Sequence, residues 1–494
     1  MNIQWSDEQL DIFSVYEDIQ ENIQVNASPG SGKTTIQCEI WNRSLLGNTL
    51  YLAFNKAIVE EMCLKTIPRH GSKISTFNSL GHSICMNTWP NIKFNVHKIA
   101  KHVRSIEHLI PERNQCRYEL IKLVKYLKNI PHALHIDEGD VEDVTEFYDI
   151  DVYPDMVDHA LHVLKENIHD TKEIDYSDQL LFPVVYNLAA PMYGTVLIDE
   201  AQDVNAVQIE LIKLLQARNP SLRLCSVGDN HQAIYAFRGA LHDSMDQLGR
   251  EFDVYEMPLT ITRRCDRKIV DYAQVLYPHD ITASPTAQEG CITTIDHTQW
   301  HIKPFMRNYI DLIPDLHFDQ NINNTLIVCR TTAPLVSFAY QLLRCNIPCY
   351  IRGRDIGENL IKYIQKSQCM YVNDFLHYMD EDINGEIERC KVLHKIDRIQ
   401  ILQDKYDMLE IFCNSINSIY IQDVCMYIQG LFKEGKGIQL STVHKSKGLE
   451  ADRVMILCKD LMPHPLASKE WELIQERNIE YVAITRARHE LVLM

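Results

Sequence analysis

The chain has 494 residues, 46 % of them hydrophobic, and a formal net charge of −18 at pH 7. This length is ample for about three domains with cores of their own. The acidic net charge argues against a protein that coats nucleic acid through its overall charge, but it leaves room for a local nucleic-acid channel.

The start of the chain and its apolar pattern predict a cytoplasmic protein without a membrane partner. No apolar run reaches 18 residues, so we expect no membrane span. The first residues, "MNIQWSDEQLDIF", have a polar, helical pattern rather than that of a signal peptide. The 15 cysteines include no C-x-x-C pair and mostly stand in apolar runs. Reduced, buried thiols are therefore expected rather than zinc ligands or disulfides.

The first chemical signature along the chain is "NASPGSGKTT", residues 26–35, between a predicted strand "NIQVNA" and a predicted helix "TTIQCEIWNRSLL". Gly30 and Gly32 let backbone N–H groups approach a phosphate, and the helix dipole favours an anion there. Lys33 can reach the β- and γ-phosphates, and the Thr34 hydroxyl can hold Mg²⁺. The predicted phosphate-binding loop comprises Ala27, Ser28, Pro29, Gly30, Ser31, Gly32, Lys33, Thr34 and Thr35. The strict pattern has glycine at the first of these positions, and the alternative is an incidental glycine-serine turn.

Short apolar strands alternate with helical stretches along most of the chain, which predicts an α/β fold. Strands are expected in "NTLYLAF", "KISTF", "GTVLIDE", "RLCSVGD", "NTLIVCR", "IPCYIRG", "GIQLSTVH" and "RVMILC". Two regions, about 82–172 and 362–434, are helical without clear strands. We interpret both regions as insertions into α/β domains.

A second nucleotide signature is "YGTVLIDEAQD", residues 193–203, an apolar strand that ends in two carboxylates. Asp199 is placed to bind Mg²⁺ through water, and Glu200 to polarise the water that attacks the γ-phosphate. The alternative is an ordinary strand followed by an acidic helix start. Paired with the loop at Lys33, the carboxylates favour a nucleoside triphosphate site.

In chain order, these and further stretches resemble the motifs of the UvrD-like helicases of superfamily 1. The resemblance runs from Gln9 to Arg488, nearly the whole chain. The similar stretches are "SDEQLDIF", "YLAFNKAIVEEM", "STFNSLGHSI", "IDYSDQLL", "SVGDNHQAIYAFRGA", "LTITRRC", "STVHKSKGLEADRVMIL" and "ERNIEYVAITRARHELVL". Eight such stretches in the family's order make the resemblance specific.

The resemblance implies two RecA-like P-loop NTPase domains, each a parallel sheet flanked by helices and each carrying a helical insertion, with ATP between them. It places the first domain at 1–81 and 173–264, its insertion at 82–172, the second domain at 265–361 and 435–494, and a reduced insertion at 362–434. It also implies single-stranded DNA lying across both domains and 3′-to-5′ movement.

The resemblance also implies which residues act in hydrolysis, beside Lys33 and Glu200. Gln232 would sense the γ-phosphate, and Arg264 and Arg486 match the family's arginine fingers. Because Arg486 lies far along the chain, a second domain must close onto the nucleotide to deliver it.

Three residues would contact the rest of the nucleotide. Gln9 would read adenine, and Glu450 would contact the nucleotide sugar or its surroundings. The family's usual tyrosine before the fourth-motif arginine is replaced by Arg263. A guanidinium plane can also stack on a base, so adenine selectivity stays open.

DNA contacts implied by the resemblance are base stacking and backbone contacts, without a base-edge code. The aromatic candidates are Phe54, Phe77, Tyr235 and Phe237, and the polar candidates are Asn55, Thr76, Asn78, Arg238, Thr442 and His444. The alternative for each aromatic ring is core packing, the commoner environment of phenylalanine.

The leading hypothesis is an ATP- and Mg²⁺-dependent DNA helicase that translocates on single-stranded DNA and acts at single/double-strand junctions, for example in DNA repair. One alternative keeps the motor with little unwinding: a DNA-activated ATPase beside a partner nuclease, in recombination or antiviral (anti-phage) defence. A second alternative is a P-loop switch or kinase without a DNA role.

Overall fold

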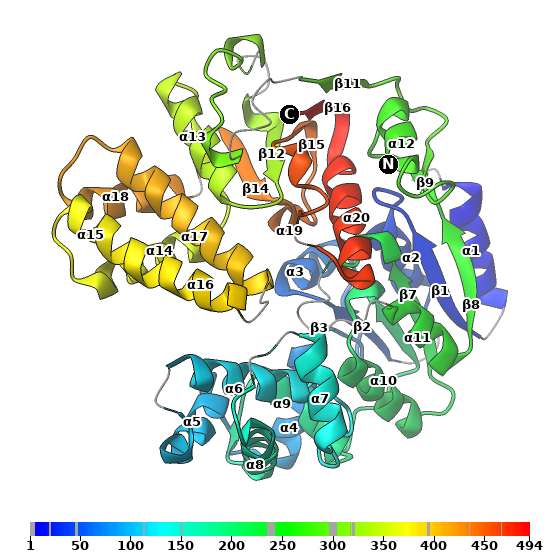
Figure 1. The fold of residues 1–494 in the computed structure, drawn as a ribbon. Helices are drawn as coiled ribbons and strands as arrows, with labels where there is room; N and C mark the ends of the chain where they lie inside the picture. The colour runs from blue at the N-terminus through cyan, green and yellow to red at the C-terminus, as the bar shows by residue number, and fades with distance from the viewer. Residues whose placement is uncertain are drawn as a thin grey trace. The chain divides into compact units, whose positions relative to one another are not determined.

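The computed structural model divides into two compact units, Met1–Thr260 and Ile261–Met494. In each unit a parallel sheet is flanked by helices (Figure 1), the architecture expected of two RecA-like domains. The structure describes residues 5–18, 21–44, 48–111, 114–148, 150, 152–234, 243–295, 304–316, 318, 322–392, 396–433, 435–465 and 467–494.

The first unit is built on a six-stranded sheet of order β3-β2-β6-β7-β1-β8, in which every neighbouring pair is parallel. Its strands are β1 (Asn22–Ala27), β2 (Thr49–Ala53), β3 (Lys73–Thr76), β6 (Thr195–Ile198), β7 (Arg223–Gly228) and β8 (Val254–Leu259). Strands β2 and β6 are buried at every position, which explains why they read as continuous apolar runs. All six carboxyl ends meet at one edge of the sheet.

Two sets of helices accompany this sheet. One set flanks it: α1 (Asp7–Asp18), α2 (Lys33–Arg43), α3 (Lys56–Lys65), α10 (Ala206–Arg218) and α11 (Ser244–Phe252). The other set forms a helical group beside it (Figure 1): α4 (Phe77–Thr88), α5 (Lys98–Ser105), α6 (Asn114–Leu127), α7 (Glu138–Phe147), α8 (Met156–His169) and α9 (Tyr176–Val185). A short parallel pair, β4 (Lys93–Phe94) and β5 (Glu173–Ile174), brackets α5 to α8.

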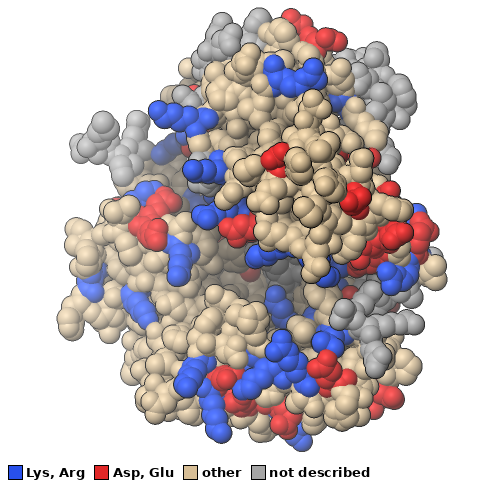
Figure 2. Space-filling model, turned by 90° about the vertical axis from the view of Figure 1, so that its left-hand side faces the viewer, with Lys and Arg blue, Asp and Glu red and all other residues tan. Residues whose placement is uncertain are grey.

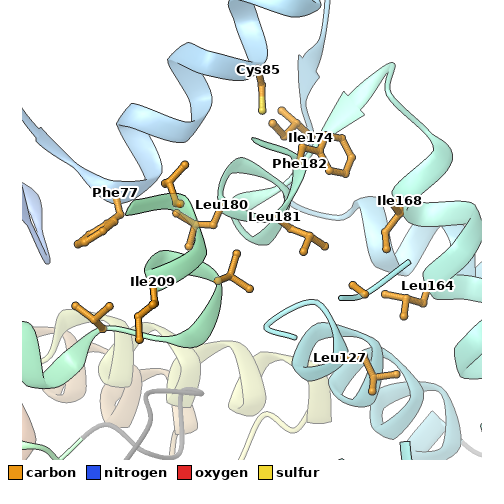
Figure 3. Close-up of a cluster of buried hydrophobic side chains, with 14 of the residues drawn as sticks. Phe77, Cys85, Leu127, Leu164, Ile168, Ile174, Leu180, Leu181, Phe182 and Ile209 are labelled. Atoms are coloured by element: carbon orange, nitrogen blue, oxygen red, sulfur yellow. The ribbon is translucent and has the colours of Figure 1, made fainter. Parts of the chain in front are cut away.

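The helical group shares a hydrophobic core with one face of the sheet. Figure 3 shows part of this core, in which Phe77 from α4 lies close to Leu180 from α9. The two helices cross closely at Gly81, where an added Cβ would lie 1.9 Å from the backbone oxygen of Gln179. A side chain at Gly81 would therefore force α4 and α9 apart.

A cluster of buried ions lies inside the helical group. Nζ of Lys98 is 2.9 Å from Oδ2 of Asp178, and both side chains are fully buried. Nζ of Lys128 is 2.5 Å from Oδ1 of Asp178, 2.7 Å from Oδ2 of Asp175 and 2.8 Å from Oδ1 of Asn167. Burial lowers the pKa of Lys98 and raises the pKa of Asp178, because it disfavours both charges. The cluster ties α5, α6 and α8 to the start of α9.

The second unit has a six-stranded sheet of order β11-β16-β15-β12-β14-β13, again parallel throughout. Its strands are β11 (Cys291–Thr294), β12 (Thr325–Cys329), β13 (Cys349–Ile351), β14 (Ile438–Thr442), β15 (Ala451–Ile456) and β16 (Ala487–Leu493), and a separate short pair consists of β9 (Ile261–Thr262) and β10 (Thr282–Ala283). The helices are α12 (Arg267–Gln274), α13 (Ala333–Arg344), α14 (Arg354–Ser367), α15 (Val372–Met379), α16 (Gly385–Val392), α17 (Ile396–Ser415), α18 (Ile421–Leu431), α19 (Val443–Ser446) and α20 (Glu470–Ile484). In Figure 1, α14 to α18 form a helical group at one side of this sheet.

All eight strands predicted from short apolar runs are present as β2, β3, β6, β7, β12, β13, β14 and β15. The sequence did not predict β8, because Glu256 and Pro258 interrupt its apolar pattern. As β8 is an edge strand of the sheet, its proline is tolerated there.

The charged side chains at the surface are of both signs, as expected if any nucleic acid binds through local contacts and not through the net charge of the chain. On the face shown in Figure 2, acidic and basic side chains are interspersed, although the net charge of the chain is −18. Among the helices that the structure describes, none is both long and apolar enough to cross a membrane.

Candidate nucleotide and DNA site

The strand order of the first unit places the predicted site residues along one edge of its sheet. The phosphate-binding loop follows β1 and Asp199 follows β6, and Asp229, which the sequence did not predict as a site residue, follows β7. Asn55 and Thr76 stand at the ends of the neighbouring strands β2 and β3. Because parallel strands point their carboxyl ends the same way, all five positions share the edge where open α/β sheets bind ligands. The nucleotide candidates of this unit follow β1 and β6, and the DNA candidates Asn55 and Thr76 stand at the ends of β2 and β3, the two strands beyond β6 in the sheet order.

The loop between β1 and α2 has the backbone of an anion cradle. Gly30 and Gly32 have φ angles of 74° and 102°, in the left-handed region that favours glycine. Helix α2 starts at Lys33 without a side-chain cap on its first turn. Its N-terminus therefore fits a phosphate. Ala27 belongs to strand β1, where an extended backbone does not require the glycine of the strict pattern.

Lys33 is directed at its own loop. Nζ donates to the backbone oxygens of Ala27 at 2.8 Å and Ser28 at 3.3 Å, and it lies 3.7 Å from Oδ2 of Asp229. The backbone N–H of Ser28 donates to the oxygen of Leu259 at the end of β8. The ammonium group is thus held over the cradle.

Gln9 packs against the same loop. Its side chain is 1 % exposed, and Nε2 donates to the backbone oxygen of Ser31 at 3.4 Å. Its Oε1 accepts the backbone N–H of Ser6 at 3.1 Å. In this structure the amide of Gln9 contacts the loop.

Asp199 is the buried carboxylate at the end of β6. The hydroxyl of Tyr51 donates to Oδ2 at 2.7 Å, and the backbone N–H of Glu200 donates to Oδ1 at 3.0 Å. Burial, and then the charge of Glu200, raise the pKa of Asp199 to about 7. A divalent cation would favour the charged form, so Asp199 and the Thr34 hydroxyl are residues that fit Mg²⁺. The sequence did not indicate a site role for Tyr51, because a tyrosine within an apolar strand is typical of a core residue.

Gln202 and Asp229, which have no role predicted from the sequence, connect the predicted catalytic groups. Nε2 of Gln202 donates to Oε2 of Glu200 at 2.5 Å, and Oε1 of Gln202 accepts the backbone N–H of Asp229 at 3.0 Å. Oδ2 of Asp229 accepts Nε2 of Gln232 at 2.6 Å. Lys33, Glu200 and Gln232 are therefore joined through Gln202 and Asp229. Both connecting residues stand inside the quoted stretches "DEAQD" and "SVGDNHQ".

In the second unit, the predicted arginine fingers meet beside the amino ends of β15 and β16. Nε of Arg264 is 2.5 Å from Oε2 of Glu450, and Nη1 donates to the backbone oxygen of Thr485 at 3.1 Å. Arg486 is 1 % exposed, and its Nη1 donates to the backbone oxygen of Leu449 at 3.2 Å. The structure thus brings Arg264, Glu450 and Arg486 together.

Glu450 is shared between two arginines, Arg264 and Arg488. Burial by itself raises the pKa of this carboxyl, but the two guanidinium groups outweigh burial and hold the pKa below its ordinary value. Glu450 is therefore charged at neutral pH. Arg263, the residue at the family's tyrosine position, is exposed.

Two of the polar DNA candidates in the first unit are helix caps. Asn55 accepts the backbone N–H of Ile58 at the start of α3, and Thr76 accepts that of Ser79 at the start of α4, each at 3.1 Å. A cap of this kind stabilises a helix by about 1 kcal/mol. Both helix N-termini lie at the carboxyl edge of the sheet, where their dipoles favour a phosphate backbone.

The neighbouring candidates differ in environment. Phe54 is half-buried, whereas Phe77 is 3 % exposed within the core of Figure 3. Core packing, the alternative interpretation, therefore fits Phe77. Nδ2 of Asn78 donates to the backbone oxygen of Tyr176 at 2.8 Å and ties α4 to α9. Tyr176 is 60 % exposed, and its ring meets Phe94 edge to face.

The remaining DNA candidates fall in two places. Tyr235, Phe237 and Arg238 lie outside the described residues. Thr442 ends β14 and His444 lies on α19, both half-buried. Thr442 and His444 thus lie at and just beyond the carboxyl end of β14, whereas Glu450 and Arg486 precede β15 and β16.

Comparison with known proteins identifies the family. A family model described as the UvrD/REP helicase N-terminal domain matches residues 5–253, and one described as the UvrD-like helicase C-terminal domain matches residues 426–494. The chain belongs to the UvrD/Rep helicase family. The resemblance inferred from the motifs is thereby confirmed.

Individual relatives of this UvrD/Rep family member carry helicase names. It is 26 % identical to the probable DNA helicase II homolog of Mycoplasma pneumoniae, over 60 % of the chain and 53 % of that protein. It is 25 % identical to F-box DNA helicase protein 1 of Schizosaccharomyces pombe, over 96 % of the chain and 55 % of that protein. It is 21 % identical to ATP-dependent DNA helicase PcrA of Staphylococcus epidermidis, over 76 % of the chain and 65 % of that protein. The chain thus spans about half the length of the first two relatives.

Proposed function

We propose that the chain is an ATP-dependent DNA helicase that translocates 3′ to 5′ on single-stranded DNA in the cytoplasm and separates strands at junctions. The observation that carries the proposal is the carboxyl edge of the first sheet. A phosphate cradle with Lys33 and the carboxylates Asp199 and Glu200 lie on the same edge as the N-termini of α3 and α4. Membership of the UvrD/Rep family supports DNA as the second ligand.

In the proposed reaction, Glu200 orients and polarises the attacking water, and Lys33 neutralises charge on the phosphates. Mg²⁺ held by Thr34 and Asp199 would add charge neutralisation at the phosphate oxygens. We assign the first RecA-like domain to residues 1–81 and 173–264, with the insertion 82–172, and the second to 265–361 and 435–494, with the insertion 362–434. Delivery of Arg486 by the second domain would complete the site.

The decisive experiment measures ATP hydrolysis by the purified chain with single-stranded DNA, duplex DNA, RNA or no nucleic acid. We expect single-stranded DNA to accelerate hydrolysis at least about tenfold over the rate without nucleic acid, a coupling of about 1.4 kcal/mol. Hydrolysis indifferent to every nucleic acid would support a P-loop switch instead.

Strand displacement on duplexes with a 3′ or a 5′ single-stranded tail then tests direction. We expect displacement only from the 3′ tail. DNA-stimulated hydrolysis without displacement from either tail would favour the DNA-activated ATPase that serves a partner nuclease.

The arginine-finger assignment predicts the effect of Arg264→Ala. Fingers act on transition-state charge, so we expect hydrolysis to fall by about 10³-fold while the affinity for a fluorescent ATP analogue changes little. The matched control is Arg267→Ala, which removes an exposed arginine that bonds the backbone oxygen of Pro285. Equal loss of hydrolysis in both variants would argue against a specific role of Arg264.

A further inference from the structure

We propose that Gln37 is a positioning residue that holds Asp199 at a fixed distance from Thr34, the two residues that fit Mg²⁺. This inference rests on the proposed function, because it requires that the chain binds ATP together with Mg²⁺. The sequence predicted no role for Gln37, which stands inside the predicted helix "TTIQCEIWNRSLL". The role follows from a contact between helix α2 and the end of strand β6.

Gln37 is a polar residue on the apolar face of α2. Its side chain is fully buried, and the other buried residues of this helix are Ile36, Ile40 and Trp41. Nε2 of Gln37 donates to the backbone oxygen of Ile198 at 2.8 Å, whereas its Oε1 has no hydrogen-bond partner among the described residues. A buried acceptor without a partner destabilises a fold. The stability of the core therefore does not explain the amide.

The oxygen that Gln37 contacts belongs to the peptide group that carries Asp199. Ile198 is the last residue of β6, and the N–H of the same peptide group donates to the backbone oxygen of Leu52 in β2 at 3.0 Å. Both polar groups of this peptide are thus bonded, one to the neighbouring strand and one to α2. Because a peptide group is planar, two such bonds fix its orientation, and with it the position from which the side chain of Asp199 starts.

Strand pairing does not join these two elements directly. In the sheet order, the strand that leads into α2 is β1, and β7 separates it from β6, which ends before Asp199. The hydroxyl of Tyr51 fixes the carboxylate of Asp199 from the side of β2, through its 2.7 Å bond to Oδ2. The bond of Gln37 adds a connection from the side of the phosphate-binding helix.

On the helix side, Gln37 stands one turn after Thr34. Residues three positions apart lie on the same side of a helix, about 4.5 Å apart along its axis. The bond to Ile198 therefore constrains the distance between the hydroxyl of Thr34 and the carboxylate of Asp199. Mg²⁺ requires nearly octahedral oxygen ligands at about 2.0–2.1 Å, whereas Ca²⁺ accepts about 2.3–2.6 Å and less regular geometry. Loss of the constraint should thus weaken Mg²⁺ more than Ca²⁺.

A purely structural role for Gln37 would give a different result. A glutamine that only packs in the core would change thermal stability when replaced, without changing how Mg²⁺ affects the affinity for a nucleotide. The coupling between two ligands is a difference between binding free energies, so it can be measured without hydrolysis.

The test measures the affinity of the full chain for a fluorescent, non-hydrolysable ATP analogue in EDTA, in Mg²⁺ and in Ca²⁺. For the wild type we expect Mg²⁺ to tighten binding at least about tenfold relative to EDTA. Gln37→Met keeps the length of the side chain but not its amide. We expect it to lose most of this gain, since removal of a group that orients a metal ligand lowers metal affinity by about 10- to 100-fold. The affinity in EDTA should stay at the wild-type value, and the gain from Ca²⁺ should fall less.

The matched control is Gln24→Met, the same substitution at another buried glutamine of the same unit. Gln24 in β1 is 1 % exposed, and its Oε1 accepts the hydroxyl of Ser226 in β7 at 3.4 Å. We expect the control to lower thermal stability and to keep the wild-type gain from Mg²⁺. Gln37→Leu provides a second apolar shape in case Gln37→Met does not fold.

A wild-type gain from Mg²⁺ in either folded variant of Gln37 would overturn the inference, as would equal losses for Mg²⁺ and Ca²⁺. Failure of both variants to fold would also overturn it, because Gln37 would then be a residue that the core requires. A wild type that does not bind the analogue, or binds it equally well with and without Mg²⁺, would instead contradict the ATP site of the proposed function.

Discussion

Lys33→Ala is expected to lower ATP hydrolysis by at least about 10²-fold, the usual loss when one preorganised charge-stabilising donor is removed. Lys33 stands at the first position of α2, and its ammonium group lies over the loop backbone and 3.7 Å from Asp229. Alanine would remove the positive charge that the loop itself directs at the phosphates. Binding of ATP should weaken as well, because the lysine contacts ground state and transition state alike.

The measurement is steady-state phosphate release with saturating single-stranded DNA, accompanied by binding of a fluorescent ATP analogue. Lys213→Ala is the matched control, because Lys213 pairs with Glu210 and Glu251 at the surface of the same unit. The control should hydrolyse ATP at the wild-type rate. If the Lys33→Ala variant kept more than a tenth of the wild-type rate of hydrolysis, the role proposed for the loop in hydrolysis would be wrong.

The sequence predicted the parts of this site whose chemistry is local. The loop around Lys33 is recognisable because glycines with positive φ, a lysine and a helix start stand at fixed spacing. Asp199 was recognisable because it ends an apolar strand. The spacing of residues does not reveal the burial of this carboxyl, which raises the pKa of Asp199 to about 7.

The sequence missed the parts that depend on contacts between distant segments. Tyr51 reads as a core residue, and only the pairing of β2 with β6 brings its hydroxyl to Asp199. Gln202 had no predicted role because its partner, the backbone of Asp229, is contributed by the next strand of the sheet. Conversely, Phe77 stands in a motif but lies in the core, because α4 packs against α9 there.

The ion pair of Arg264 with Glu450 is another contact between distant segments that the sequence did not predict. Both residues were assigned to the nucleotide separately, Arg264 as an arginine finger and Glu450 as a contact of the sugar or its surroundings. The fold of the second unit places their side chains in direct contact. A finger that starts from an ion pair must exchange this contact for the phosphate. The free energy lost by breaking the ion pair therefore offsets part of the gain from the phosphate contact.

The second large effect is expected on stability, from Asp178→Asn in the buried ion cluster. Asp178 faces both Lys98 and Lys128, and all three side chains are fully buried. The variant leaves two buried ammonium groups with a single carboxylate, that of Asp175. Removing one partner of a buried ion pair usually costs about 3–5 kcal/mol, because the remaining charge is neither hydrated nor compensated.

Hydrogen exchange at the amides of α5, α6 and α9 measures this loss where it arises, and denaturant unfolding measures it for the whole chain. The surface control is Glu173→Gln, which breaks a 3.0 Å pair with the half-exposed Lys101 and should cost less than about 1 kcal/mol. When Lys98→Met is added to Asp178→Asn, one buried ammonium group, that of Lys128, remains with one carboxylate, that of Asp175. If uncompensated charge is the cause, the double variant must be more stable than the sum of the two single losses predicts. Additive losses would instead mean that packing, and not charge, makes the cluster necessary.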